Sequence, residues 1–178
     1  MTRAMGLAAA ALLWAAPAAA QERVRPTTRV MVEAGYVGTD YGFGEGPLAS
    51  LAVARRGSGG ALLGRLSYAN RFREDAFQAE VEAYPRLARR AYAYAAAGVG
   101  TGGAFPLRRA AAEAFVGFGP GWEASAGFRA MDYGESAVEI YTASLGRYVG
   151  NWWGAGRVYV SPALQGHDRA GEAALRRY

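Results

Sequence analysis

The chain has 178 residues and a formal net charge of +5, all 20 of its basic residues are arginine, and it has no cysteine. Without cysteine there are no disulfides, no haem attachment through a CxxCH motif and no thiolate metal sites. The arginines are dispersed and form no continuous stripe, which argues against a nucleic-acid-binding protein. The length suits one domain behind an N-terminal signal.

The first 20 residues have the features of a secretory signal peptide. Arg3 gives a positive start, residues 7–16 form an apolar run, and small residues at 17–20 precede Gln21. A membrane anchor is the alternative, but the run is shorter than the ~20 residues that a spanning helix needs. We therefore predict a signal peptide at 1–20, cleaved during export across the inner membrane, and a short tail at 21–28.

From residue 29 onwards, short stretches alternate apolar with polar or small residues and are separated by glycine-rich turns. This pattern is typical of a transmembrane β-barrel, whose strands satisfy their backbone groups by pairing and need no long apolar run. We predict an all-β, antiparallel up-and-down barrel of about ten strands at 29–178, in the outer membrane of a Gram-negative bacterium. A soluble β-sandwich is the alternative fold. The strands are predicted around 30–36, 51–53, 62–72, 77–84, from 92, 109–118, 122–129, 138–149, 152–161 and 170–178.

The predicted links between strands alternate in length. Bacterial barrels have short periplasmic turns and longer outer loops, and the alternation fits that order with the N-terminus in the periplasm. A short link at 73–75 is the exception. Short links are predicted at 57–60, 85–90, 119–121 and 150–151, and mostly longer ones at 39–46, 101–107, 132–136 and 162–169.

Charged side chains recur on the faces predicted to line the lumen. A narrow barrel fills its interior with side chains, and paired charges satisfy one another there. We predict a lumenal charge ladder. The alternative is that Glu80 and Glu82, two apart on one strand, act as the acid and base of a glycoside hydrolase. The predicted ladder consists of Arg65, Arg71, Glu80, Glu82, Glu113, Glu123, Arg129 and Arg157.

The single histidine, His167, is predicted in an outer loop beside Asp168, with no serine within a few residues. Lipid hydrolases and acyltransferases that use a serine nucleophile need a histidine base next to it. A solvated loop histidine is therefore the favoured interpretation. We predict no catalytic residue, no metal site and no cofactor.

Aromatic residues lie mainly towards the predicted strand ends, where their rings favour the headgroup region of a membrane. A platform on which carbohydrate rings stack is the alternative. The predicted girdle residues are Tyr36, Tyr68, Phe72, Tyr84, Tyr92, Trp122, Phe128, Tyr148, Trp152 and Trp153.

Three segments together resemble the YaiO-type outer-membrane β-barrel family: residues 79–87 (AEVEAYPRL), 120–129 (PGWEASAGFR) and 140–153 (IYTASLGRYVGNWW). The resemblance covers most of the chain from Tyr36. It implies an outer-membrane barrel of no settled biochemical activity, which in some relatives lies beside or is fused to glycosyltransferase-like or repeat domains. Similar proteins continue into further strands beyond the Arg-Arg-Tyr stretch that ends this sequence. We expect either a C-terminally truncated fragment or a barrel that closes with fewer strands.

An open sheet in lipid leaves unpaired backbone groups on its edge strands, so we expect the first strand to pair with the strand at 170–178. The expected function is a structural or passage-forming, porin-like role and not an enzymatic one, with a candidate link to surface polysaccharide export. A lipid- or glycan-modifying enzyme is the alternative. The expected partners are outer-membrane lipid and lipopolysaccharide, the barrel assembly machinery and polysaccharide export components, and no nucleic acid.

Overall fold

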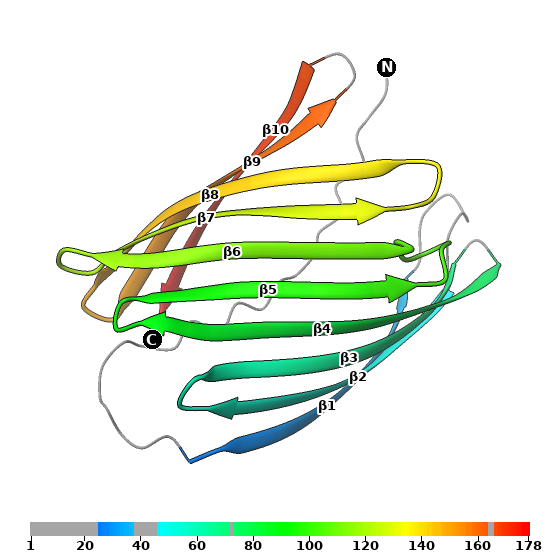
Figure 1. The fold of residues 1–178 in the computed structure, drawn as a ribbon, viewed down its shortest axis with the longest axis horizontal. Coiled ribbons are helices and arrows are strands. Elements are labelled where there is room, and N and C mark those ends of the chain that lie inside the picture. Colours follow the sequence, from blue (N-terminus) through cyan, green and yellow to red (C-terminus); the bar gives the residue numbers. More distant parts are fainter. Residues whose placement is uncertain (1–24, 38–45, 72, 164–165) are drawn as a thin grey trace.

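The computed structural model describes residues 25–37, 46–71, 73–163 and 166–178. These residues form one antiparallel sheet in which strands that follow one another in sequence are hydrogen-bonded neighbours (Figure 1). The prediction of an all-β, up-and-down architecture with ten strands is confirmed. The strands are β1 (Thr27–Val37), β2 (Gly46–Gly57), β3 (Gly60–Arg71), β4 (Glu74–Ala88), β5 (Ala91–Gly100), β6 (Arg108–Phe118), β7 (Trp122–Asp132), β8 (Ala137–Val149), β9 (Trp152–Ala163) and β10 (Gly166–Arg177).

The two ends of the sheet differ in their connections. At one end, called the short-turn end below, two or three residues link β2 to β3, β4 to β5, β6 to β7 and β8 to β9. At the other, the loop end, residues 101–107 link β5 to β6 and residues 133–136 link β7 to β8. The link from β3 to β4 is also short at the loop end, as the sequence predicts. The predicted loop at 39–46 lies mostly outside the described residues.

The predicted turn at 85–90 is wrong. β4 continues to Ala88, so only Arg89 and Arg90 link it to β5. Pro85 lies inside β4, in a stretch that forms no pairs with β5 and is followed by a register shift. A proline is tolerated in a strand at such an irregularity because its missing N–H removes no ladder bond there.

The predicted outer loop at 162–169 is also wrong. β9 extends to Ala163 and β10 begins at Gly166, so His167 and Asp168 lie in a strand. Gly166 has a φ of 137°, a backbone conformation that glycine adopts more readily than any other residue. This glycine allows β10 to begin at residue 166, four residues before the predicted start at 170.

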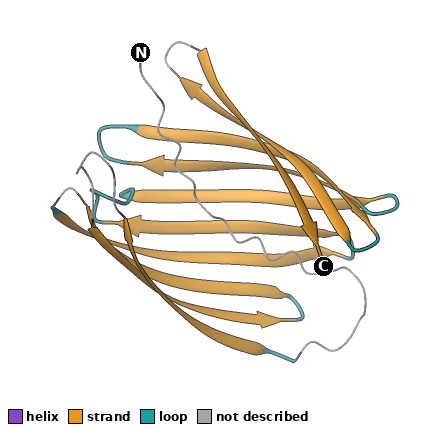
Figure 2. Ribbon diagram, turned by 180° about the vertical axis from the view of Figure 1, so that it is seen from behind, coloured by secondary structure: helices purple, strands orange, loops and turns teal. Residues whose placement is uncertain are grey.

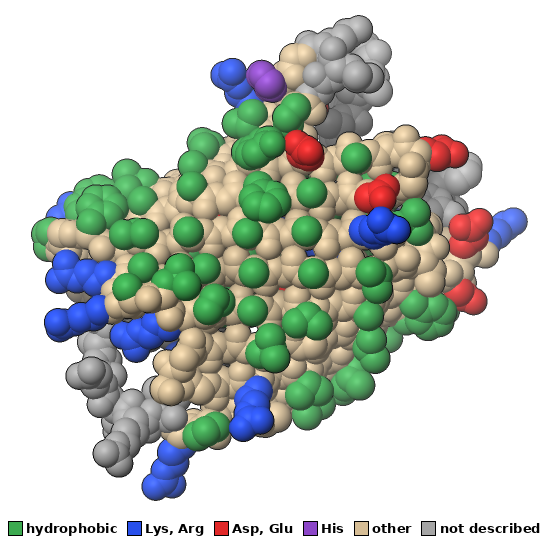
Figure 3. All heavy atoms as spheres, viewed as in Figure 1, with side chains coloured by type: hydrophobic (Ala, Val, Ile, Leu, Met, Phe, Trp, Pro, Cys, Tyr) green, Lys and Arg blue, Asp and Glu red, His purple; other side chains and the backbone are tan. Residues whose placement is uncertain are grey.

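The two faces of the sheet alternate as a transmembrane barrel requires. In β4 the outward side chains include Phe77 and Val81, which are 56% and 54% exposed, whereas the intervening Glu80 is 6% exposed. Apolar side chains are spread over the face of the sheet seen in Figure 3. The inner face has a floor of buried small residues, among them Ala52, Ala96 and Ala111. The same alternation assigns the faces of β8, in which bulky residues occupy both sets of positions: Thr142 is buried on the inner face and Leu145 is exposed on the outer one.

The first and last strands are the edges of an open sheet. Among the described residues β1 pairs with β2 alone and β10 with β9 alone, so the expected pairing of the first strand with the last is not formed. Figure 2 shows β9 and β10 crossing the concave side of the curved sheet. Each hairpin joins strands that follow one another in the sequence, whereas the first-to-last pairing depends on the tilt and stagger of the whole sheet. The sequence therefore predicts the hairpins better than the closure.

Candidate functional site

The centre of the inner face holds a buried polar network around Glu113, on β6. Arg157, on β9, approaches both of its carboxylate oxygens, with Nη2 at 2.9 Å from Oε1 and Nη1 donating to Oε2 at 3.0 Å. Ser125 Oγ donates to the same Oε1 at 2.6 Å and lies 2.5 Å from Ser144 Oγ. Glu113 is only 6% exposed. Such a bidentate, hydrogen-bonded pair meets the condition under which a buried charge is tolerated.

Small residues allow Arg157 to cross two strands. The register places Ser144 of β8 opposite Arg157 and Ser125 of β7 opposite Ser144. Two serines therefore lie on the strands that the Arg157 side chain crosses. Gly127 lies opposite Glu113, and a Cβ at Gly127 would be 2.6 Å from the Glu113 Cβ. The network therefore depends on small residues on the strands between its charged partners.

A second ion pair lies nearer the loop end. Arg109 Nη1, on β6, is 2.5 Å from Glu80 Oε2, on β4, although the contact lacks the alignment of a hydrogen bond. Gly98 of β5 is in register with both residues, and a Cβ there would be 3.1 Å from Arg109 Cγ. Arg109 therefore reaches Glu80 across a glycine. Arg65, on β3, is in register with Glu80 on its other side and has a buried Nε without a hydrogen-bond partner.

Aromatic side chains occupy the inner face towards the short-turn end. Tyr92 and Phe115 stack with ring centroids 4.5 Å apart and an interplanar angle of 4°. Three further ring pairs complete this inner aromatic cluster: Tyr84 with Tyr94, Tyr148 with Trp153, and Tyr148 with Tyr178. The inner face thus has charged residues at its centre and the inner aromatic cluster towards the short-turn end.

The inner aromatic cluster corrects part of the predicted girdle. Tyr84, Tyr92, Tyr148 and Trp153 face inwards, whereas Trp122 and Trp152 at the same end face outwards. The error at Tyr92 arose because alanine occupies both faces of β5 and hides its alternation. Of the remaining predicted girdle residues, Phe72 lies outside the described residues.

Comparison of the whole chain with family models gives a match to the YaiO membrane beta barrel domain over residues 27–178. The chain belongs to this family. The resemblance of residues 79–87, 120–129 and 140–153 is thereby confirmed, and the chain is an outer-membrane β-barrel protein. Searches of curated proteins and of solved structures gave no match. In the part of the chain that the structure describes, no helix is long and apolar enough to cross a membrane.

In this YaiO-family chain, strand parity brings the eight predicted ladder residues to the inner face. The structure brings Glu113 and Arg157 together directly, and places Arg65 beside Glu80. Glu82 instead accepts a hydrogen bond from Tyr84 Oη at 2.6 Å. The remaining members lie at other levels of the same face: Arg71 at the end of β3, Glu123 at the start of β7 and Arg129 in the second half of β7. Their joint action as a ladder stays a prediction.

The predicted ladder omits Arg109, Ser125 and Ser144. Arg109 is four residues from Glu113 on the same strand face, and this parity could have indicated it. The serines carry no such signal, because a small polar residue on an inner face also serves as filler. Their role becomes visible only with the register between β7 and β8.

The alternative enzymatic sites have the following surroundings in the YaiO-family fold. Glu80 and Glu82 share the inner face, with Arg109 against the first and the Tyr84 hydroxyl on the second. His167 lies on the outward face of β10, opposite Pro162 of β9. Its neighbour Asp168 belongs to the other face, opposite Ser161.

Proposed function

We propose that this outer-membrane barrel is a structural component with a side-chain-filled interior that excludes sugars and larger solutes. The observation that carries the proposal is the Glu113–Arg157 pair, which ties β6 to β9 across the inner face, with Ser125 and Ser144 bonded beneath it. Narrow barrels are filled by side chains, whereas wide ones leave an aqueous channel. The bidentate pair therefore supports a filled interior.

The proposal predicts the permeability of liposomes that contain the folded mature chain. Wild-type protein should not admit arabinose in a liposome-swelling assay. The Glu113→Ala, Arg157→Ala double variant should admit it, because the pair that crosses the inner face is gone. Heat-modifiable migration in unboiled detergent gels should confirm that both proteins fold. Rapid swelling with wild-type protein would replace the filled interior by a passage-forming, porin-like role.

The inner aromatic cluster favours a second candidate function, passage of a glycan chain in surface polysaccharide export. Half-buried rings such as Tyr94 and Trp153 can lie against the apolar faces of sugar rings. Binding of oligosaccharides by the vesicle-inserted chain, lost in Trp153→Ala, would support this candidate and the proposed contact with export components.

The proposed role requires export across the inner membrane and insertion into the outer membrane. Residues 1–20 act as a signal peptide, the barrel assembly machinery inserts the mature chain, and its lasting partners are outer-membrane lipid and lipopolysaccharide. No catalytic step and no cofactor are part of the proposal. N-terminal sequencing of outer-membrane fractions should begin at Gln21, and retention of Met1 would contradict cleavage.

A further inference from the structure

Charge is unevenly distributed between the two ends of the sheet. In Figure 3 the arginines gather at the left, which is the short-turn end, and most of the acidic side chains lie at the right, which is the loop end. The acidic residues of the loop end include Glu74, Glu135 and Glu139. The short-turn end presents exposed arginines in its turns and on its outer face, called the arginine rim here: Arg55, Arg89, Arg90, Arg147 and Arg177.

Two members of the arginine rim lie over outward tryptophan rings. The Arg147 guanidinium is 5.0 Å from the centre of the Trp122 ring, and that of Arg177 is 5.7 Å from the Trp152 ring. Each arginine is directly opposite its tryptophan on the neighbouring strand. Tryptophan favours the headgroup level of a membrane. The rings therefore hold the two guanidinium groups at the depth of lipid phosphates, where arginine binds anions well.

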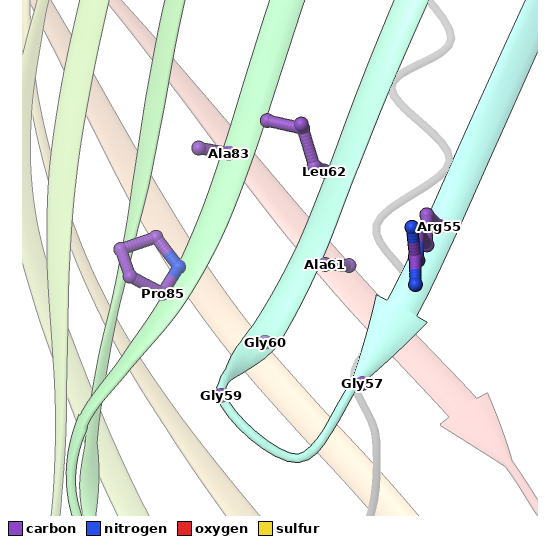
Figure 4. A pocket seen from close by; sticks show the side chains of 8 residues that line it. All are labelled: Arg55, Gly57, Gly59, Gly60, Ala61, Leu62, Ala83 and Pro85. Atoms are coloured by element: carbon purple, nitrogen blue, oxygen red, sulfur yellow. The ribbon is translucent and has the colours of Figure 1, made fainter. Parts of the chain in front are cut away.

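Arg55 occupies a comparable position on the opposite part of the sheet. Figure 4 shows it at the edge of a shallow, open groove beside the β2–β3 turn. Leu62, Ala83 and Pro85 supply apolar surface to this groove. An apolar groove that ends at an arginine matches a lipid, which has an acyl chain attached to a charged headgroup.

We propose that the arginine rim is a binding surface for anionic phospholipid, with the headgroup phosphates on Arg55, Arg147 and Arg177 and the acyl chains on the adjoining apolar face. Short turns lie on the periplasmic side in bacterial barrels, so this surface meets the phospholipid leaflet. Charge complementarity and continuity with the apolar outer face select lipid as the occupant. The inference does not depend on whether the interior is filled.

The test measures headgroup preference at the two outward tryptophans. Mature Trp153→Phe protein retains Trp122 and Trp152 as its fluorophores. It is folded into vesicles of brominated phosphatidylcholine that contain increasing fractions of phosphatidylglycerol, and the relief of quenching gives the relative association constant. An arginine near an anionic surface contributes about fivefold to binding. We expect phosphatidylglycerol to be preferred about fivefold or more, with the preference weakening at high salt.

The decisive comparison uses matched variants of equal charge change. Arg147→Gln with Arg177→Gln should bring the association constants of the two lipids close to equality. Arg108→Gln with Arg169→Gln, at the loop end, should leave the preference unchanged. Equal association of the two lipids with the unsubstituted rim would overturn the proposal, as would equal losses in the two double variants. Heat-modifiable migration checks that each variant is folded.

Discussion

The strands at the centre of the sheet and those at its edges are built from similar residues but are held differently. Between β4 and β9, inner side chains bond across intervening strands, as in Arg157 to Glu113 and Arg109 to Glu80. β1 is exposed along almost its whole length, and its inner Glu33 accepts a 3.2 Å hydrogen bond from Ser50 of the adjacent strand. Long inner side chains therefore stabilise the sheet only where its curvature brings distant strands together.

The largest expected difference between centre and edge comes from removing a buried charge. Glu113→Leu leaves Arg157 buried without its partner and should lower the free energy of unfolding by about 3–5 kcal/mol. Glu33→Leu, at the edge, should leave it almost unchanged. The measurement is the urea midpoint of vesicle-inserted protein. The Glu113→Leu, Arg157→Leu double variant should recover part of the loss, and a double variant weaker than the single one would contradict an orphaned charge as the cause.

An added methyl group should separate the two regions by a smaller amount. A Cβ at Gly127 would lie 2.5 Å from the Ala112 carbonyl oxygen, whereas one at Gly171 in β10 would lie 3.8 Å from the nearest heavy atom. Gly127→Ala should therefore cost about 1–3 kcal/mol through overpacking, and Gly171→Ala should be tolerated. Urea midpoints in the same vesicles test the contrast. Equal midpoints would mean that the backbone at Gly127 yields easily.

The smallest free-energy change is expected within the inner aromatic cluster. A double-mutant cycle on Tyr92→Leu and Phe115→Leu should give a coupling of about 0.5–1.5 kcal/mol, because the stacked rings contribute beyond the area they bury. The same cycle on Tyr92 and Val32, which lie on different faces of distant strands, should show no coupling. A coupling free energy near zero for the stacked pair would mean that these rings stabilise the barrel only through the area they bury.

Lipid-facing and inner positions of β4 should respond differently to an added charge. Val81, in the centre of β4, is 54% exposed and faces lipid. Val81→Arg should therefore destabilise the inserted barrel by about 2–4 kcal/mol and lower the folding yield in lipid vesicles. Glu82→Arg changes the neighbouring inner position and should cost less, since lumenal positions tolerate charge. Equal folding yields would reverse the assignment of the two faces.

Period-two alternation was sufficient to predict the number of strands, their hairpin order and the faces of residues such as Val81 and Glu113, because each depends on local sequence. It failed where alanine occupied both faces, as around Tyr92 in β5. Partner choice could not be predicted either. Arg109 reaches Glu80 because Gly98 lies between them in register, and register over three strands is set by the turns and the packing together. The link between β9 and β10 was misjudged for the opposite reason, since polar His167 and Asp168 look like loop residues in sequence.

The open edges also have a kinetic consequence. Each hairpin joins residues close in sequence, so its loop-closure entropy is low and it can form early. Pairing β1 (Thr27–Val37) with β10 (Gly166–Arg177) would join opposite ends of the chain and would be the slowest contact to form. Until then, both edges present rows of unpaired backbone groups that another strand can bind. Pairing of either edge with another chain therefore competes with closure until the first and last strands meet.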